Sequence, residues 1–136
     1  MTEKNQLNIF DEQLEECSCD PLTGFFRSGC CETSEQDLGS HTVCALMTEE
    51  FLEFSFKKGN DLISAVPQFD FPGLKPGDKW CLCANRWLEA YEAKSAPLIL
   101  AKATHKRALE IISMEQIKEY AIDISRIMIS ISWKKL

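Results

Sequence analysis

Cysteine and histidine are the residue types through which this 136-residue chain could do chemistry. It contains seven cysteines and two histidines, and thiols and imidazoles serve as nucleophiles, bases and metal ligands. The densest grouping is WCLC, in which Cys81 and Cys83 follow the turn sequence PGD. We take Cys81, Cys83, Cys31 and His41 as candidate catalytic residues, with Cys81 as thiolate and a second cysteine to resolve it. The base would be His41 or His105.

The conformation of WCLC decides what its two thiols can do. Asp78 can cap a first turn, so we predict that a helix begins at Lys79 and buries an apolar stripe that includes Trp87. In that helix Cys81 lies in the first turn, where the dipole favours a thiolate, and Cys83 lies about 200° around the axis. If residues 79–83 form a strand instead, both sulfurs face the same way. Alternatively, both cysteines are buried as small apolar core residues and have no chemical role.

The other thiols and imidazoles are spread along the chain. Cys30 and Cys31 are adjacent, so an extended backbone points them to opposite faces and only one can be core. His41 and Cys44 have the spacing of a CxxC pair, but on a strand they also face opposite ways. A zinc site would have to draw on Cys30, Cys31, Cys44, Cys81, Cys83, His41 and His105. Repeated CxxC pairs are absent, so we expect no stoichiometric zinc, and the sequence assigns no cofactor.

Charge and hydropathy narrow the classes of partner. Residues 1–56 carry twelve acidic and two basic side chains, and the basic residues of the second half are scattered, so we expect no nucleic-acid partner. We expect no membrane partner either, because no apolar run reaches the length of a span. The N-terminal residues lack a signal-peptide pattern, which predicts a cytoplasmic protein with reduced thiols. A small molecule, another protein or a second copy of the chain remain as partners.

Periodicity predicts the elements that position these residues. Residues 1–15 form an acidic tail, and residues 16–122 form one α+β domain with a mixed or antiparallel sheet and about three helices. We predict strands at residues 42–47, 97–104 and 109–112, and a turn at DPLTG that returns as a hairpin. Thr48 and Ser113 can each cap a helix. Residues 123–136 alternate Ile with Ser, which predicts a strand that pairs with a sheet edge or with a dimer partner.

Four long runs carry a family resemblance: CDPLTGFFRSGCC, LGSHTVCALMTEEFLEFSFKKGNDL, FPGLKPGDKWCLCANRW and ATHKRALE. Together they resemble Domain of Unknown Function 2237, a family of small, mainly bacterial proteins, over residues 17–121. The resemblance implies no activity. It places most of the cysteines and both histidines on motif positions, whereas Cys19 and Ser28 depart from the pattern.

Three functions remain open at this point. The chain lacks GxSxG, P-loop, GxGxxG, HExxH and zinc-deaminase motifs, so it has no warrant for those enzyme classes. We favour a binding or structural domain with a core rich in reduced thiols. A thiol or redox enzyme using Cys81 and a Cys/His metal-binding protein are the alternatives, so whether it is an enzyme stays open. Arg27, Arg86 and Arg107 could each hold an anion, but solvated arginines are common and we assign them no ligand.

Overall fold

The computed structural model describes residues 6–124, and these contain a three-stranded sheet and three α-helices. The strands are β1 (His41–Leu46), β2 (Lys79–Cys83) and β3 (Leu98–Ile99). The helices are α1 (Glu49–Lys57), α2 (Ala84–Glu92) and α3 (Met114–Tyr120). Both strand pairings are antiparallel, in the order β2-β1-β3. The predicted α+β class is therefore confirmed.

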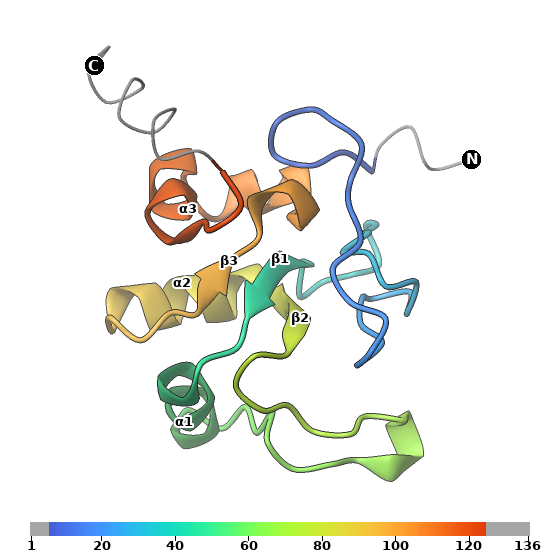
Figure 1. Ribbon diagram of the computed structural model, residues 1–136, viewed down its shortest axis with the longest axis vertical. Coiled ribbons are helices and arrows are strands. Elements are labelled where there is room, and N and C mark those ends of the chain that lie inside the picture. The colour runs from blue at the N-terminus through green and yellow to red at the C-terminus, as the bar shows by residue number, and fades with distance from the viewer. Residues whose placement is uncertain (1–5, 125–136) are drawn as a thin grey trace.

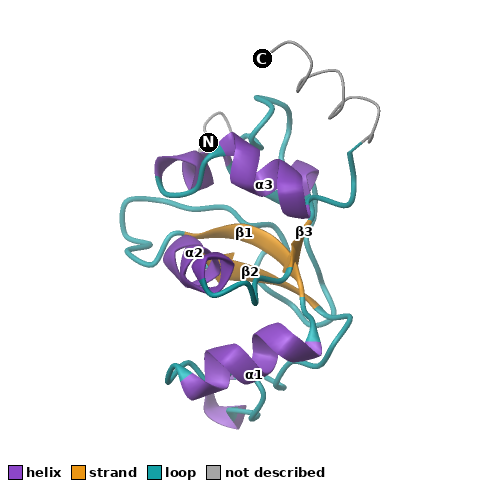
Figure 2. Cartoon of the chain, turned by 90° about the vertical axis from the view of Figure 1, so that its left-hand side faces the viewer, coloured by secondary structure: helices purple, strands orange, loops and turns teal. Residues whose placement is uncertain are grey.

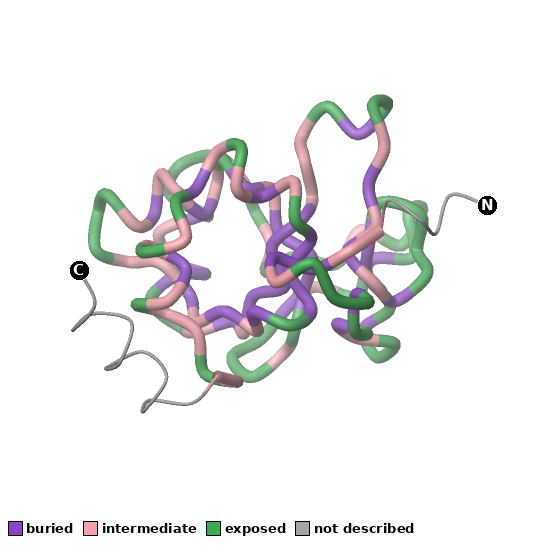
Figure 3. Tube along the Cα trace, turned by 90° about the horizontal axis from the view of Figure 1, so that it is seen from above, coloured by how far each residue is buried: buried purple, intermediate pink, exposed green. Residues whose placement is uncertain are grey.

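Strand β1 lies at the centre of the sheet because its middle residues are apolar on both faces. Val43, Cys44 and Ala45 are all fully buried, as expected for a strand covered on two sides. Figure 2 shows the sheet as a middle layer, with α3 above it and α1 below it. In Figure 1 the labelled helices α1, α2 and α3 lie to the left, and the blue and cyan N-terminal segment lies to the right. Figure 3 shows buried residues along the chain at the centre of the molecule.

The two helices with the clearest capping signals form as predicted. The Thr48 side chain accepts from the backbone N–H of Phe51 at the start of α1. Ser113 and Gln116 form a reciprocal capping box at the start of α3, which satisfies two backbone donors that a helix leaves free. Because these caps need only neighbouring residues, the local sequence suffices to predict them.

The predicted helix start at Lys79 is wrong. Residues 79–83 form β2, which pairs with β1 in a register that places Cys44 opposite Cys81 and His41 opposite Cys83. Helix α2 begins only at Ala84, and the Asp78 side chain accepts from the N–H of Lys75 in a turn. A run of four apolar residues after a turn fits a strand as well as a helix, and the neighbouring strand satisfies its backbone groups.

Three further expectations change in the structure. The predicted strand at residues 97–104 shortens to β3, followed by a 3-10 helix at Ala101–Ala103, and residues 109–112 are not a strand because a 3-10 helix spans Lys106–Glu110. The hairpin at DPLTG is reduced to one bridge between Cys19 and Leu22.

The sequence predicted an acidic tail at residues 1–15 and a strand at residues 123–136. Residues 7–15, within the predicted acidic tail, form a folded loop in which Asn8 and Ile9 are buried. The Asn8 side chain donates to the carbonyl of Lys102. The predicted C-terminal strand, and the dimer that would use it, lie largely outside the described residues. Within residues 6–124, no helix is both long enough and apolar enough to cross a membrane.

Candidate functional site

All seven cysteines lie in the described part of the chain, and four of them form two disulfides. Cys17 is bonded to Cys44, and Cys31 is bonded to Cys81. These four cysteines, together with Ala103, form a small buried cluster of their own. The prediction of a core rich in reduced thiols is therefore wrong, because the fold brings two cysteines of the irregular N-terminal segment onto the facing pair on β1 and β2.

Besides the Arg27 guanidinium over Trp80, two attachments hold the loop of residues 23–29 over β2, and the first is the Cys31–Cys81 disulfide. The second is the buried Thr23 hydroxyl, which accepts from the backbone N–H of Cys81 at 2.8 Å. Gly24 has a φ of 104°, and a Cβ there would lie 2.5 Å from the carbonyl oxygen of Cys30. Only glycine fits this tight loop without movement of the backbone, so the loop closes firmly above the strand.

A buried carboxylate orients the imidazole of His41. Asp37 Oδ1 lies 2.7 Å from His41 Nδ1, and Oδ2 accepts from the Thr33 hydroxyl and from the His41 backbone N–H, each at 2.9 Å. The Asp37 side chain is 1% exposed, whereas that of His41 is 41% exposed. An ionised carboxylate can only accept, so Nδ1 carries the hydrogen and Nε2 is the nitrogen that remains for a ligand.

Gly39 makes room for this arrangement. A Cβ at Gly39 would lie 2.7 Å from the Cε1 atom of His41, which is closer than such atoms approach in proteins. Because Asp37 holds the ring at Nδ1, the ring could not swing aside without loss of that hydrogen bond. Glycine at position 39 therefore leaves the space that the ring needs in the orientation that Asp37 holds.

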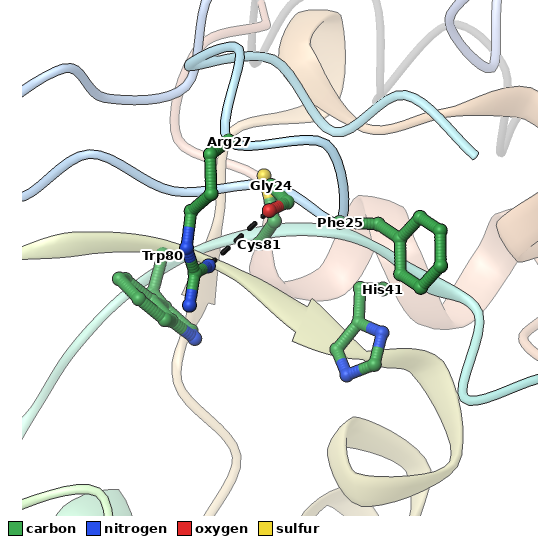
Figure 4. A pocket seen from close by; sticks show the side chains of 6 residues that line it. All are labelled: Gly24, Phe25, Arg27, His41, Trp80 and Cys81. Carbon is green, nitrogen blue, oxygen red and sulfur yellow. Dashed lines mark hydrogen bonds between the residues drawn. The ribbon is translucent and has the colours of Figure 1, made fainter. Parts of the chain in front are cut away.

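His41 forms one wall of a cavity of about 280 Å³, which we call the Arg27 pocket (Figure 4). It is lined by Gly24, Phe25, Arg27, His41, Trp80 and Cys81. Arg27 and Trp80 lie on one side of this pocket, and Phe25 with His41 lies on the other. The guanidinium carbon is 5.2 Å from the centre of a Trp80 ring, and Nη1 donates to the carbonyl of Gly24 at 3.2 Å. The Phe25 ring is stacked on His41 with centroids 6.4 Å apart.

A second cavity, of about 230 Å³, shares His41 and Trp80 with the first, and we call it the Arg86 pocket. Its lining is His41, Asn60, Leu62, Trp80, Leu82, Cys83 and Arg86. Arg86 donates to Glu89 one turn later in α2, at 3.1 Å. Cys83 immediately precedes α2, and its thiol is free and half-buried. One imidazole therefore serves two cavities, each with an arginine.

The predicted catalytic residues separate into two groups. Cys81 and Cys31 are joined in a disulfide, so neither is a free nucleophile, whereas His41 and Cys83 line the Arg86 pocket together. His105 is buried and accepts from the N–H of Arg107 at the start of a short helix. The proposed zinc ligands do not gather as thiolates. The sulfurs of Cys17, Cys31 and Cys81 do lie within 4.8 Å of one another, but they belong to the two disulfides.

Sequence reasoning missed Asp37, Trp80 and the role of Arg27. Asp37 lies in a polar stretch that reads only as a turn, although its four-residue spacing from His41 was a usable signal. Arg27 has a φ of 54°, a backbone conformation that non-glycine residues seldom adopt. No sequence pattern predicts that a loop carries this arginine across to Trp80, because the approach depends on the disulfide and on Thr23.

The two remaining free cysteines lie beside acidic groups. A hydrogen bond with Glu16 raises the pKa of the exposed Cys19 thiol. Burial, followed by the charges of Glu32 and Glu16, raises the pKa of Cys30. Each shift favours the protonated thiol, so neither cysteine has the surroundings of a reactive thiolate.

The comparison with protein families now gives the class of the chain. Residues 7–121 match the family model described as an uncharacterized protein conserved in bacteria, DUF2237. The match spans most of the chain, so the protein belongs to this family. No curated protein matches the chain. The family description assigns no activity.

Proposed function

We propose that this protein binds a small anionic molecule in the Arg27 pocket, with Arg27 as the cationic partner and His41 Nε2 as a second polar contact. The observation that carries the proposal is the guanidinium fixed over Trp80 and facing an imidazole that a buried carboxylate orients. The cavity of about 280 Å³ lies just below the volume typical of drug-sized ligands, which favours a small metabolite.

The state of Arg27 supports an anion as ligand. No carboxylate within residues 6–124 forms an ion pair with Arg27, although it is exposed and charged. One of its five donors is used on Gly24, so most of the planar fork is available. The positive φ at Arg27 costs the folded state about 1–3 kcal/mol, and such backbone strain clusters at ligand sites.

His41 adds acid–base capacity to the pocket. In its neutral form Nε2 accepts a proton or a hydrogen bond, and in its charged form it donates one and adds a second positive charge. Asp37 holds the ring in one orientation through Nδ1. A carboxylate or a phosphate can accept from Arg27 and from the charged form of His41. Only a phosphate that keeps a P–OH group can also donate to Nε2 of the neutral form.

Redox conditions bear on this proposal. The predicted cytoplasmic location stays a prediction, and disulfides such as Cys31–Cys81 favour a compartment in which thiols are oxidised. In a reducing compartment the loop that carries Arg27 would be held over β2 by Thr23 without the covalent link. Anion binding would then weaken when the disulfide is reduced.

The test is a titration of isotope-labelled protein with acetate and, separately, with inorganic phosphate, at constant ionic strength. Saturable shifts of the Trp80 indole and His41 ring signals are expected, and the two anions show which geometry is preferred. Arg27→Gln should weaken binding about tenfold or more, because a hydrogen bond to a charged group contributes about 1.5–3 kcal/mol.

Arg107→Gln is the matched control. Arg107 faces Glu110 at 3.8 Å and lines neither pocket, so its replacement should leave the affinity unchanged. Equal weakening in the two variants would show only a general charge effect. Signals of Trp80 and His41 that do not move with either anion would refute the proposed binding site.

A further inference from the structure

The Arg86 pocket holds a thiol, an oriented imidazole and a cation within one cavity. Cys83 and His41 are cross-strand partners of β2 and β1, and both line this pocket with Arg86. The backbone beside them is joined by a hydrogen bond of 3.0 Å from the N–H of Ala84 to the carbonyl of Ser40. The relative position of thiol and imidazole is therefore set by the sheet and by the start of α2.

We propose that Cys83 is a nucleophile that reacts with an electrophilic carbon of a small carboxylate bound in the Arg86 pocket, with His41 taking the thiol proton. The inference rests on the proposed function to the extent that both use His41. The inference differs from the proposed function because it uses the Arg86 pocket and Arg86 in place of the Arg27 pocket and Arg27, and because a covalent bond forms.

The chemistry assigns one role to each group. The sulfur of Cys83 forms a bond to the electrophilic carbon, and the bond from that carbon to its leaving group breaks, so that the leaving group departs with the electron pair. The thiol proton passes to His41 Nε2 and then to solvent. Asp37 holds Nδ1 and so keeps Nε2 available as the accepting nitrogen. Arg86 pairs with the carboxylate of the incoming molecule.

Two features of Cys83 leave it available for this step. Its side chain makes no capping hydrogen bond to α2, although it stands at the residue that precedes the helix. It is also outside both disulfides, unlike Cys81 two residues earlier on the same strand. The Ala84 N–H is used on Ser40, but the remaining first-turn amides and the positive dipole end of the nine-residue helix α2 add to the attraction for an anion at this end of the pocket.

The experiment compares iodoacetate, which is anionic, with iodoacetamide, which is neutral. The folded, oxidised protein is alkylated with each reagent, and the rate at each cysteine is followed by peptide mapping. The ratio of the iodoacetate rate to the iodoacetamide rate should be about tenfold higher at Cys83 than at Cys19 and Cys30. Glu16 and Glu32 repel the anion at those two thiols, whereas Arg86, which uses Nη1 on Glu89, keeps its other donors for the anion at Cys83. The same molecule thus contains its own control thiols.

Two variants separate the roles of the cation and the base. Arg86→Gln should lower the iodoacetate rate at Cys83 about fivefold or more and leave the iodoacetamide rate within about twofold, because only the first reagent carries a charge. His41→Gln should lower both rates about tenfold or more and alter their dependence on pH, since general base catalysis is lost. Arg107→Gln should change neither rate.

The outcomes distinguish this inference from the proposed function. Equal rate ratios at Cys83 and Cys30, or rates at Cys83 that His41→Gln does not change, would overturn the nucleophile. Cys83→Ser should retain the anion-induced shifts of the Arg27 pocket, whereas Arg27→Gln should retain the selectivity of Cys83 for iodoacetate. Failure of anion binding with intact Cys83 selectivity would therefore remove only the proposed function, and the reverse result would remove only this inference.

Discussion

Two parts of this molecule are held together by different means. Residues 6–40 contain isolated bridges but no helix or strand of regular length, and two disulfides attach them to the sheet. Residues 41–124 contain all of the regular elements described above, packed around an aliphatic and aromatic core. Ile9 is the only residue of the first part in the buried set of that core, as far as residues 6–124 show.

The candidate site lies where the two parts meet. The first part contributes Arg27, Phe25 and Asp37, and the second contributes His41 and Trp80. The irregular part can place an arginine and a carboxylate where no regular element reaches, but it needs covalent and polar anchors to keep them there. The site therefore depends on anchors that contribute little to the main core.

The largest effect is expected from removal of the Cys31–Cys81 link. The double variant Cys31→Ala with Cys81→Ala should lower the free energy of unfolding by about 4 kcal/mol, from the loop entropy of a sequence separation of 50 residues. Urea denaturation measures the change, and the anion that shifts the Trp80 signal should bind more weakly. Removal of Cys17–Cys44, with a separation of 27, should cost about 0.5 kcal/mol less. If removal of either disulfide lowered the free energy of unfolding by less than about 1 kcal/mol, the disulfides would not be the anchors that hold the first part to the sheet.

A truncated core side chain in the second part should lower stability without changing the site. Ile117 is fully buried in α3, so Ile117→Ala should lower the free energy of unfolding by about 2–4 kcal/mol through lost packing. The ring signals of His41 and Trp80 should stay in place, because the site is anchored elsewhere. Shifts of those signals as large as in the disulfide variant would mean that the two parts are not independent.

The buried carboxylate at the junction should matter for both stability and the site. Asp37→Asn should cost about 1–3 kcal/mol, because the amide cannot accept from all three donors that Asp37 satisfies. Nitrogen chemical shifts of His41 should report a changed proton distribution between Nδ1 and Nε2. Unchanged nitrogen shifts would show that Asp37 does not set the tautomer.

The smallest effect is expected from a helix cap far from the site. Ser113→Ala removes one half of the capping box of α3 and should cost about 1 kcal/mol. Thr48→Ala at α1 is the parallel case, since its hydroxyl accepts from the N–H of Phe51. Neither variant should alter anion binding or Cys83 alkylation. A cost near that of the disulfide variant would indicate that local caps, rather than cross-links, limit the stability of this fold.

The sequence alone determined the parts of this protein that rest on short-range interactions. The caps of α1 and α3 use residues three positions apart, and the apolar run of β1 marks a central strand, so these elements and the α+β class were predictable. The alternation of an extended chain also predicted that only one of the adjacent Cys30 and Cys31 is buried, and the structure shows that this residue is Cys31.

Only the tertiary structure decided the rest. Residues 79–83 carry signals for both helix and strand, and the balance is set by the backbone partners that β1 and the Thr23 hydroxyl supply. The cysteine pairings join residues 27 and 50 positions apart, and periodicity carries no information about contacts at that range. Arg27, His41 and Cys83 became a candidate site because loop closure and strand register bring them together, and both are properties of the folded chain.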